Sequence, residues 1–276
     1  METLNSLTPA HPASGAALKP EITVVMPALN EEKNIRAAIE NTINAFDDNR
    51  IRGEVIVIND GSTDRTEGIV AEMMKMDGRI GILRHETPKG IGNSFWDGVD
   101  MAASDCVVML PGDNENDPWE IFRYLRLLEH VDMIIPFVFN KETRSFLRNA
   151  LSFVYRFIVN TTFFTNFNYT NGTVLYRKSV LKDLDYRSSG FFFQTDILVR
   201  SVKKGYLFAE VPYRLGMRKG GLSKAVSFPS FYKVVKGYMR LVRDFYFVKK
   251  DKKGGSLSED SQAAKRQYPQ SKSKLI

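Results

Sequence analysis

The first half of the chain alternates between two hydrophobic patterns. Short apolar runs, a pattern typical of buried strands, occur at Ile22–Met26, Val55–Ile58, Ile80–Arg84 and Cys106–Leu110. Longer segments with apolar residues at helical spacing lie at Glu31–Phe46, Asp64–Met76, Ile91–Ala103 and Trp119–His130. Strict alternation of strand and helix is typical of βαβ units with a parallel sheet. The pattern therefore predicts an α/β fold with a Rossmann-like, mostly parallel sheet flanked by helices.

Two segments of the second half combine aromatic and basic residues at helical spacing. Residues 145–164 carry an apolar stripe made of Phe146, Leu147, Ala150, Leu151, Phe153, Val154, Phe157 and Ile158. Arg144, Arg148 and Arg156 lie largely off that stripe, and Phe228–Lys250 repeats the arrangement. Amphipathic helices at a membrane interface have this character, and a helix packed on the sheet is the alternative for the first segment. No apolar run approaches the roughly 18 residues of a membrane span, so we expect peripheral attachment to a membrane surface.

The composition suggests four regions along the chain. We expect a disordered leader at 1–20, a globular domain at 21–225, a basic aromatic amphipathic helix at 226–248 and a disordered basic tail at 249–276. The leader has no basic stretch followed by an apolar one and so does not resemble a secretory signal. We therefore expect a cytoplasmic protein, peripherally associated with the inner face of the membrane.

Three polar loops directly follow predicted strands. They are Pro27–Glu32, Asn59–Asp64 and Pro111–Asp117. In an open parallel sheet, ligands bind beyond the carboxyl ends of the strands. The three loops should therefore face one crevice, where we expect the chemistry.

The residue types in these loops indicate what the crevice could bind. Asp60 could accept hydrogen bonds from the imide or ribose of a nucleotide, with Gly61 allowing close backbone approach, although an ordinary turn and helix cap is the alternative. Asp113 and Glu115 are hard oxygen ligands that could hold Mg²⁺ or Mn²⁺ together with substrate phosphates. Acidic turns are common, so the indication comes from the three loops taken together.

Net charge limits the classes of partner, and cysteine content limits the kinds of site that the chain can form. The formal net charge of +7 favours an anionic partner, which could be nucleic acid, an anionic lipid surface or a phosphorylated substrate. No nucleic-acid-binding motif accompanies the basic aromatic segments, and a nucleic-acid-binding module has no need of the acidic loops, so we expect no nucleic-acid partner. Cys106 is the only cysteine, which excludes an internal disulfide and a cysteine-rich metal site.

Taken in order, the loops resemble those of the family 2 glycosyltransferases of the GT-A fold, from about Ile22 to Lys224. The family's Pro-x-x-Asn-Glu segment is matched by Pro27, Asn30 and Glu31, and its Asp-Gly-Ser-x-Asp segment by Asp60, Ser62 and Asp64. Its Lys-Gly segment is matched by Lys89 and Gly90. The resemblance implies that these residues surround the nucleotide of a nucleotide-sugar donor.

The metal loop departs from the family's Asp-x-Asp pattern. Asp113 occupies the position of the second aspartate, but Pro111 occupies that of the first. Glu115 lies near the usual glutamine and could compensate. The resemblance implies a Mg²⁺ or Mn²⁺ ion at Asp113 and Glu115, with the strength of the metal dependence left open.

The second half resembles the dolichyl-phosphate mannosyltransferase-like, or polyprenyl-phosphate glycosyltransferase, branch of the family. Asn168–Arg177 is similar to its Asp-x-Thr-Ser-Gly-Phe-Arg segment, with Asn168 replacing aspartate, and Gln194 and Asp196 match its Gln-x-Glu segment. Its Arg-x-x-Gly-x-Ser-Lys segment is matched by Arg218, Ser223 and Lys224, which are chemically suited to phosphate oxygens.

The resemblance implies an inverting transfer of a sugar from a nucleotide-sugar to a polyprenyl phosphate. The expected catalytic residues are Asp113, Gln194, Asp196 and Arg218. The alternative acceptor is a sugar hydroxyl of a polysaccharide or glycolipid. A hydroxyl acceptor must lose a proton, and Asp196 is then the candidate base. A phosphate acceptor is already ionised and needs no strong base.

Overall fold

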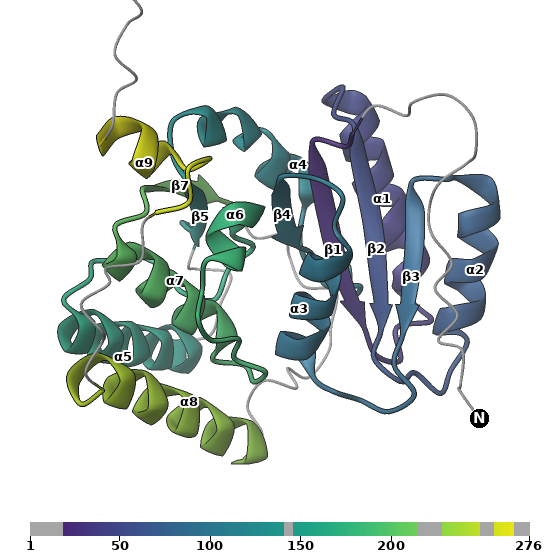
Figure 1. Cartoon of the computed structure of the whole chain (residues 1–276). Helices are drawn as coiled ribbons and strands as arrows, with labels where there is room; N and C mark the ends of the chain where they lie inside the picture. The colour runs from purple at the N-terminus through teal and green to yellow at the C-terminus, as the bar shows by residue number, and fades with distance from the viewer. Residues whose placement is uncertain (1–18, 141–145, 215–227, 249–256, 268–276) are drawn as a thin grey trace, which may run out of the picture. The chain divides into compact units, whose positions relative to one another are not determined.

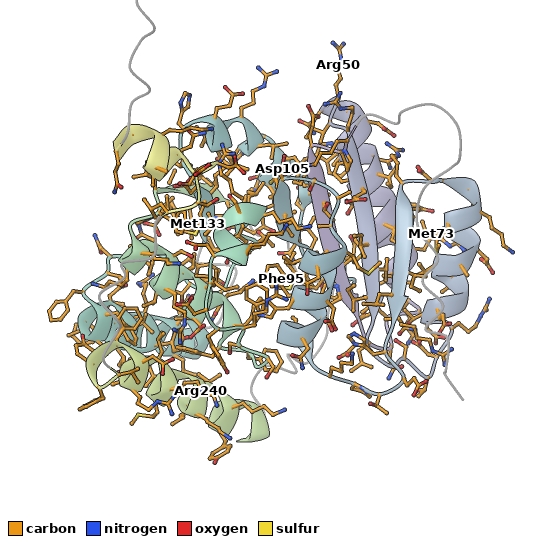
Figure 2. The ribbon with its side chains drawn as sticks, viewed as in Figure 1. Arg50, Met73, Phe95, Asp105, Met133 and Arg240 are labelled. Carbon is orange, nitrogen blue, oxygen red and sulfur yellow. The ribbon has the colours of Figure 1, made fainter. Side chains whose placement is uncertain are left out.

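The computed structural model describes residues 19–140, 146–214, 228–248 and 257–267. These residues form two compact units, and the chain passes from the first to the second between Phe122 and Arg123 (Figure 1). Both units have a buried core, as Phe95 in the first unit and Met133 in the second are fully buried, whereas the exposed Arg50 points away from the protein (Figure 2).

The first unit contains four strands in the order β3-β2-β1-β4. They are β1 (Ile22–Ala28), β2 (Gly53–Asn59), β3 (Ile80–Arg84) and β4 (Cys106–Met109). All three pairings are parallel, and Val24 at the centre lies opposite Val55 on one side and Val108 on the other. The nearly continuous apolar runs are explained by this position, because strands of a parallel sheet are covered on both faces.

Helices cover both faces of this sheet. On one face α1 (Ile35–Asp48) contacts both α2 (Thr66–Met76) and β2, and Figure 1 shows α3 (Ile91–Met101) on the opposite face. The helix α3 approaches β1 closely at Gly98, where a Cβ atom would lie 2.4 Å from Cγ1 of Val25. This arrangement confirms the predicted α/β architecture.

One predicted helix is wrong. Instead of a single helix over Trp119–His130, the chain forms the short α4 (Pro118–Phe122) and then the 3₁₀ helix η1 (Leu125–Glu129). Tyr124 lies between them, and its hydroxyl donates to the Pro212 carbonyl at 2.9 Å. A contact distant in sequence therefore fixes the chain where the helical spacing alone predicted continuation.

The second unit is built on three strands in the order β6-β5-β7. They are β5 (Met133–Val138), β6 (Leu175–Arg177) and β7 (Phe208–Tyr213). The β5–β7 pair is parallel and the β5–β6 pair antiparallel. The helices of this unit are α5 (Phe146–Phe163), α6 (Lys178–Lys182), α7 (Phe193–Lys204), α8 (Phe228–Tyr246) and α9 (Gln262–Gln267).

The two amphipathic helices predicted in the second half are α5 and α8, which lie side by side. The Thr162 and Tyr238 hydroxyls are 2.7 Å apart, and the Phe163 ring packs edge-on against Tyr238 and Phe245. Leu241 of α8 is fully buried. Each helix therefore has one face packed in the unit.

The segment 249–276 was expected to be a disordered tail, and this is wrong for residues 257–267. These residues contain α9, whose first two amide groups, Gln262 and Ala263, donate to the buried carboxylate of Asp132 at 2.5 and 3.2 Å. The Tyr206 hydroxyl accepts the Ser258 amide at 3.1 Å. Pairing with a buried carboxylate orders a segment whose own composition offers little to bury.

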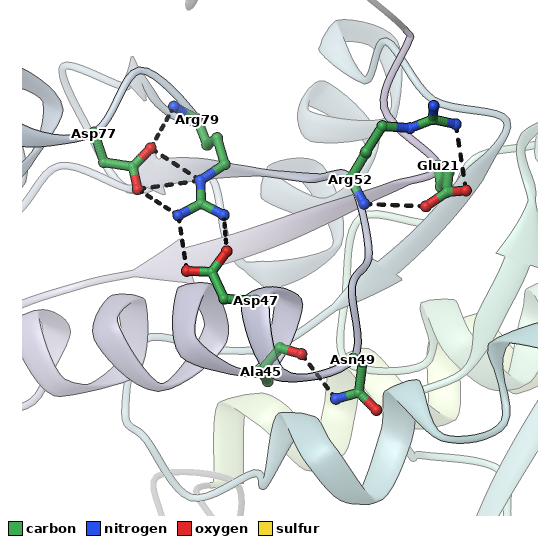
Figure 3. A network of polar contacts seen from close by, with 7 residues as sticks. All are labelled: Glu21, Ala45, Asp47, Asn49, Arg52, Asp77 and Arg79. Atoms are coloured by element: carbon green, nitrogen blue, oxygen red, sulfur yellow. Dashed lines mark hydrogen bonds and ion pairs between the residues drawn. The ribbon is translucent and has the colours of Figure 1, made fainter.

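Charged residues at the amino ends of the first unit's strands pair with each other (Figure 3). Arg79, just before β3, donates to Asp77 at 2.8 Å and to Asp47 at 2.5 Å. Arg52, just before β2, binds Glu21 at 3.3 Å. These charges are satisfied within the unit and lie at the opposite end of the strands from the three polar loops.

Candidate active site

The polar loops after β2 and β4 are both hydrogen-bonded to the carboxyl end of β1. The Asp60 amide donates to the Ala28 carbonyl at 2.9 Å, and the Gly112 amide donates to the Pro27 carbonyl at 3.0 Å. Since these carbonyls are neighbours on β1, the loops flank its carboxyl end. The parallel sheet thus brings the predicted loops to one edge of the first unit, as its strand order requires.

The loops after β1 and β2 are hydrogen-bonded to each other. Asn30, whose backbone is left-handed with φ of 57°, donates its amide to the Ser62 hydroxyl at 3.0 Å. Its side-chain oxygen accepts the Thr63 amide at 2.8 Å. The Glu31 amide donates to the Thr66 hydroxyl at 2.8 Å. Asn30, Glu31 and Ser62, all expected to bind nucleotide, are therefore held in one polar cluster.

Asp60 is almost completely buried, and both of its oxygens have protein partners. Oδ1 accepts the Lys89 amide at 2.8 Å and lies 2.7 Å from Nδ1 of His85, while Oδ2 accepts the Gly90 amide at 2.9 Å. Burial raises the pKa of Asp60, but the hydrogen bonds from His85, Lys89 and Gly90 outweigh it and lower the pKa below 3.8. Because each carboxylate oxygen can accept two hydrogen bonds, Oδ2 keeps capacity for a ligand.

The geometry around this turn requires glycine at two positions. Gly90 has φ of 92° where α3 begins, and Gly61 has φ of 77°. A Cβ atom on Gly61 would lie 2.9 Å from Cδ of Pro88. Both positions require glycine, so the loop after β2 and the turn before α3 fit against each other only with these residues.

His85 is a site residue that sequence reasoning missed. It follows β3 directly, and its ring lies between Asp60 and Asp97, with Nε2 2.9 Å from Oδ2 of Asp97. Nζ of Lys89 lies 3.7 Å from the same Asp97 oxygen. The only signal in the sequence was the position of His85 at the end of a predicted parallel strand, since a lone histidine matches no motif.

The loop carrying Asp113 is fixed from several sides. Gly112 is buried against α1, where a Cβ atom would lie 2.8 Å from Cδ1 of Ile35. Asn114 has φ of 57°, and its side-chain oxygen accepts a hydrogen bond from the side-chain amide of Asn41 at 3.0 Å. Oδ1 of Asp113 accepts the Glu115 amide at 3.1 Å. Asp113 is half-buried and Glu115 is exposed.

This loop fits one kind of metal site. In the described part of the chain no group of three or more His, Cys, Asp or Glu side chains could hold a metal ion. One or two carboxylates are, however, what Mg²⁺ uses when substrate phosphates supply its other ligands. The residues present therefore fit an ion shared with a diphosphate and do not fit a cage built only by the protein.

In the second unit, the expected acceptor segments are joined by hydrogen bonds. The Gln194 side chain donates to the Gly172 carbonyl at 2.8 Å, and the Thr195 hydroxyl donates to Oδ1 of Asn171 at 3.3 Å. The backbone amide and the side-chain amide of Asn168 both donate to the Glu210 carboxylate, at 2.6 and 2.7 Å. Arg218, Ser223 and Lys224 lie outside the described residues.

Asp196 is buried in a charged cluster that links α7 to α8. Its Oδ2 is 3.0 Å from Nε of Arg200, and the same guanidinium binds Asp244 of α8 at 2.7 Å. Burial has the largest effect on Asp196 and raises its pKa to about 6, against the opposing effect of Arg200. The side chain is only 2% exposed, so this conformation connects two helices and does not present the carboxylate to solvent.

This fold and site define a class of protein, an α/β protein with acidic loops at the carboxyl ends of its parallel strands. Residues 23–185 match the family model Glycosyl transferase family 2, and the chain belongs to that family. The match to the family model includes the loops that carry Asp60, Lys89 and Asp113, and it also includes Asn168.

Two curated relatives come from bacteria. The chain is 27% identical over 171 residues to dodecaprenyl-phosphate galacturonate synthase of Rhizobium johnstonii, covering 59% of this chain and 50% of the relative. It is 26% identical over 205 residues to undecaprenyl-phosphate 4-deoxy-4-formamido-L-arabinose transferase of Edwardsiella ictaluri, covering 74% of this chain and 62% of the relative. The chain thus spans only 50% to 62% of the length of these two relatives.

Solved structures support the GT-A fold. Glucosyl-3-phosphoglycerate synthase from Mycobacterium tuberculosis in complex with UDP is similar, with a TM-score of 0.64 and 18% identity over 86% of this chain and 88% of that one. The same enzyme with Mn²⁺, UDP-glucose and phosphoglyceric acid gives a TM-score of 0.62 and 18% identity over 81% and 80%. The predicted fold class is confirmed.

Proposed function

We propose that the protein is an inverting glycosyltransferase that moves a sugar from a nucleotide-sugar donor to a polyprenyl phosphate. The observation that carries the proposal is the pair of acidic loops, with Asp60 and Asp113, that flank the end of β1 in a member of glycosyl transferase family 2. The two curated relatives, named for dodecaprenyl and undecaprenyl phosphate, support the acceptor class.

We assign binding of the donor nucleotide to the first unit. The buried Asp60 and the Lys89–Gly90 turn that it binds form one polar group, and Asn30, Glu31 and Ser62 form the adjoining one. Pro27 is buried, and its carbonyl fixes the metal loop by accepting the Gly112 amide. A prearranged set of this kind loses little conformational entropy when a nucleotide binds.

Asp113 would hold a Mg²⁺ or Mn²⁺ ion, with Glu115 in the same loop as a second ligand. Such an ion would neutralise negative charge on the diphosphate leaving group. The fixed loop around Asp113 supports this assignment, as do the similar solved structures that contain Mn²⁺ with UDP-glucose or Mg²⁺ with UDP.

The burial of Asp196 favours the phosphate acceptor over the hydroxyl acceptor. A base that removes a hydroxyl proton must come within hydrogen-bond reach of the acceptor oxygen. Asp196 is 2% exposed and paired with Arg200, so it is suited to positioning α7 and the neighbouring Gln194. Arg218, Ser223 and Lys224 are assigned to phosphate oxygens on their motif alone. The hydroxyl acceptor remains the second candidate.

We also propose that α5 and α8 attach the protein to an anionic membrane surface, on the cytoplasmic side. On α5, the side chains Leu151, Phe153, Val154, Phe157 and Ile158 are each between 44% and 62% exposed. On α8, Tyr232, Val235 and Met239 are exposed beside the exposed Lys233 and Lys236. Among the described helices none is both long and apolar enough to cross a membrane.

Charge complementarity supports a lipid surface as the occupant of this face. Arg156 stacks over Phe153 at 5.8 Å, and Lys203 over Phe164 at 5.9 Å, so basic groups border the exposed aromatic rings. Aromatic side chains bordered by Lys and Arg suit the boundary between acyl chains and anionic headgroups.

The experiment that tests the proposed function is transfer of radiolabel from a panel of nucleotide sugars into purified polyprenyl phosphate, with and without Mg²⁺ or Mn²⁺. Label in the extracted lipid supports the proposal and names the donor. If the protein binds a nucleotide sugar but no donor gives labelled lipid, the phosphate acceptor is wrong and the hydroxyl acceptor is favoured.

A further inference from the structure

His85 is the one histidine of the described residues that lies among charged groups in the core. Its side chain is 2% exposed, and its amide donates to the Asn59 carbonyl at 2.9 Å. The two ring nitrogens lie 2.7 Å from Asp60 and 2.9 Å from Asp97. The ring therefore connects the end of β2 to the middle of α3.

Both ring nitrogens face carboxylate oxygens, which accept hydrogen bonds and donate none when ionised. The pKa of Asp60 is lowered, so its Oδ1 accepts the hydrogen bond and Nδ1 of His85 donates it. The other charged group facing this cluster is Lys89, with Nζ 3.7 Å from Asp97; the neighbouring Arg84 is paired with Glu67 at 3.4 Å.

The contact between His85 and Asp60 constrains the turn before α3. Oδ1 of Asp60 is shared between the His85 ring and the Lys89 amide, and Oδ2 accepts the Gly90 amide. The carboxylate can keep both amide contacts only in one orientation, which the ring contact fixes. His85 thus acts on the Lys89–Gly90 turn through Asp60.

We propose that His85, held between Asp60 and Asp97, is a positioning residue for nucleotide binding. The inference deepens the proposed function and rests on it, since it concerns the site assigned to the donor nucleotide. It assigns no chemical step to His85. Its role is to hold Asp60 and the Lys89–Gly90 turn in the arrangement that receives the nucleotide.

Two substitutions separate the contacts of the ring. His85→Asn places an amide N–H near the position of Nδ1 and retains a donor to Asp60. His85→Gln places it near the position of Nε2 and retains only the contact to Asp97. His130→Gln, which changes an exposed histidine of the second unit, is the matched control.

Binding of UDP, GDP, CDP and dTDP is measured by titration calorimetry, and the nucleotide that the wild type binds most tightly is used for the variants. Because the lost hydrogen bond is charge-assisted, we expect His85→Gln to raise the dissociation constant at least about tenfold. His85→Asn should stay within about threefold of the wild type, and His130→Gln should match it. Circular dichroism identifies any variant that does not fold.

A second measurement uses only the wild-type protein. Two-bond ¹H–¹⁵N correlation spectra report which imidazole nitrogen carries a proton, and we expect Nδ1 of His85, which faces Oδ1 of Asp60, to carry one. An unprotonated Nδ1 would contradict the proposal, even if a variant failed to fold.

The outcomes separate this inference from the proposed function. Equal binding by the wild type and a folded His85→Gln variant overturns the inference alone, as does equal weakening by both His85 variants. If the wild type binds none of the four nucleotides, the assigned donor site is wrong, and the inference fails with it.

Discussion

At the scale of single residues, the proposed reaction depends most on Asp113. The loop of this carboxylate is fixed by Gly112 packed against Ile35 and by the Asn41–Asn114 hydrogen bond. Removing the carboxylate should therefore leave the loop in place while it removes a metal ligand.

We predict that Asp113→Ala lowers kcat/KM for sugar transfer at least about 100-fold, because metal neutralisation of a leaving group is worth several kcal/mol. The melting temperature should change little. Asp117→Asn, in the same loop and with an acceptor retained for the Trp119 amide, is the control. Activity that survives Asp113→Ala would overturn the metal assignment.

Asp196 provides a test of the acceptor. If the acceptor is a phosphate, Asp196→Asn should reduce turnover by less than about tenfold, because no general base is removed. Near-total loss of turnover in a folded variant would instead favour a hydroxyl acceptor. Steady-state rates with saturating donor distinguish the two results.

The pKa of Asp196 also predicts a pH dependence of stability. Its pKa is raised from 3.8 to about 6 in the folded protein. Between these pH values the folded state holds a proton that the unfolded state has lost, so the contribution of this group to stability falls as the pH rises from about 4 to 6. Relative to Asp196→Asn, the wild type should lose unfolding free energy across this window in urea titrations. A rise across the same window would contradict the assignment.

The sequence predicted where some residues of the candidate site lie and not others, for physical reasons. Asp60 and Asp113 were predictable because residues after parallel strands share one edge of the sheet. The contacts of His85 depend on Asp97 in α3, and the burial of Asp196 depends on Asp244 in α8. These partners are chosen by tertiary packing, which local spacing does not encode.

At the scale of elements, the cluster around Arg200 joins α7 to α8. We predict that Arg200→Met lowers the free energy of unfolding by about 3 kcal/mol, because Asp196 is left buried without its partner. The control is Arg79→Met in the network of Figure 3, where partly exposed ion pairs contribute only about 1 kcal/mol. Chemical denaturation measures both. Equal effects of the two substitutions would contradict a special role for the buried cluster.

The bounds of the helices and strands show where the local hydrophobic pattern was sufficient to predict them. The strand predicted at Ile80–Arg84 has the predicted bounds, because a short apolar run between polar loops has few alternatives. The first helix begins at Ile35 and not at Glu31, because Asn30 and Glu31 are bound to the loop after β2. The ordered α9 depends on the buried Asp132, far away in sequence.

At the scale of the whole molecule, the proposed attachment to a membrane surface rests on the exposed apolar residues of α5 and on the positive net charge. We predict that Phe157→Glu, at a side chain 62% exposed, lowers partitioning onto vesicles containing phosphatidylglycerol about tenfold. Met76→Glu, at a side chain 81% exposed in the first unit, is the control and should have no such effect. Co-sedimentation with anionic and neutral vesicles measures both. Equal binding by wild type and Phe157→Glu would contradict attachment through α5.

The central claim is that a phosphate accepts the sugar, and a matched pair of acceptors tests it most directly. With the donor found in the panel, transfer is measured to a polyprenyl phosphate and to the unphosphorylated polyprenol of the same length, by wild type and Asp113→Ala. The account predicts labelled lipid only from the polyprenyl phosphate and only with the wild type. Labelling of the polyprenol or of a glycan hydroxyl, with none of the polyprenyl phosphate, would contradict it.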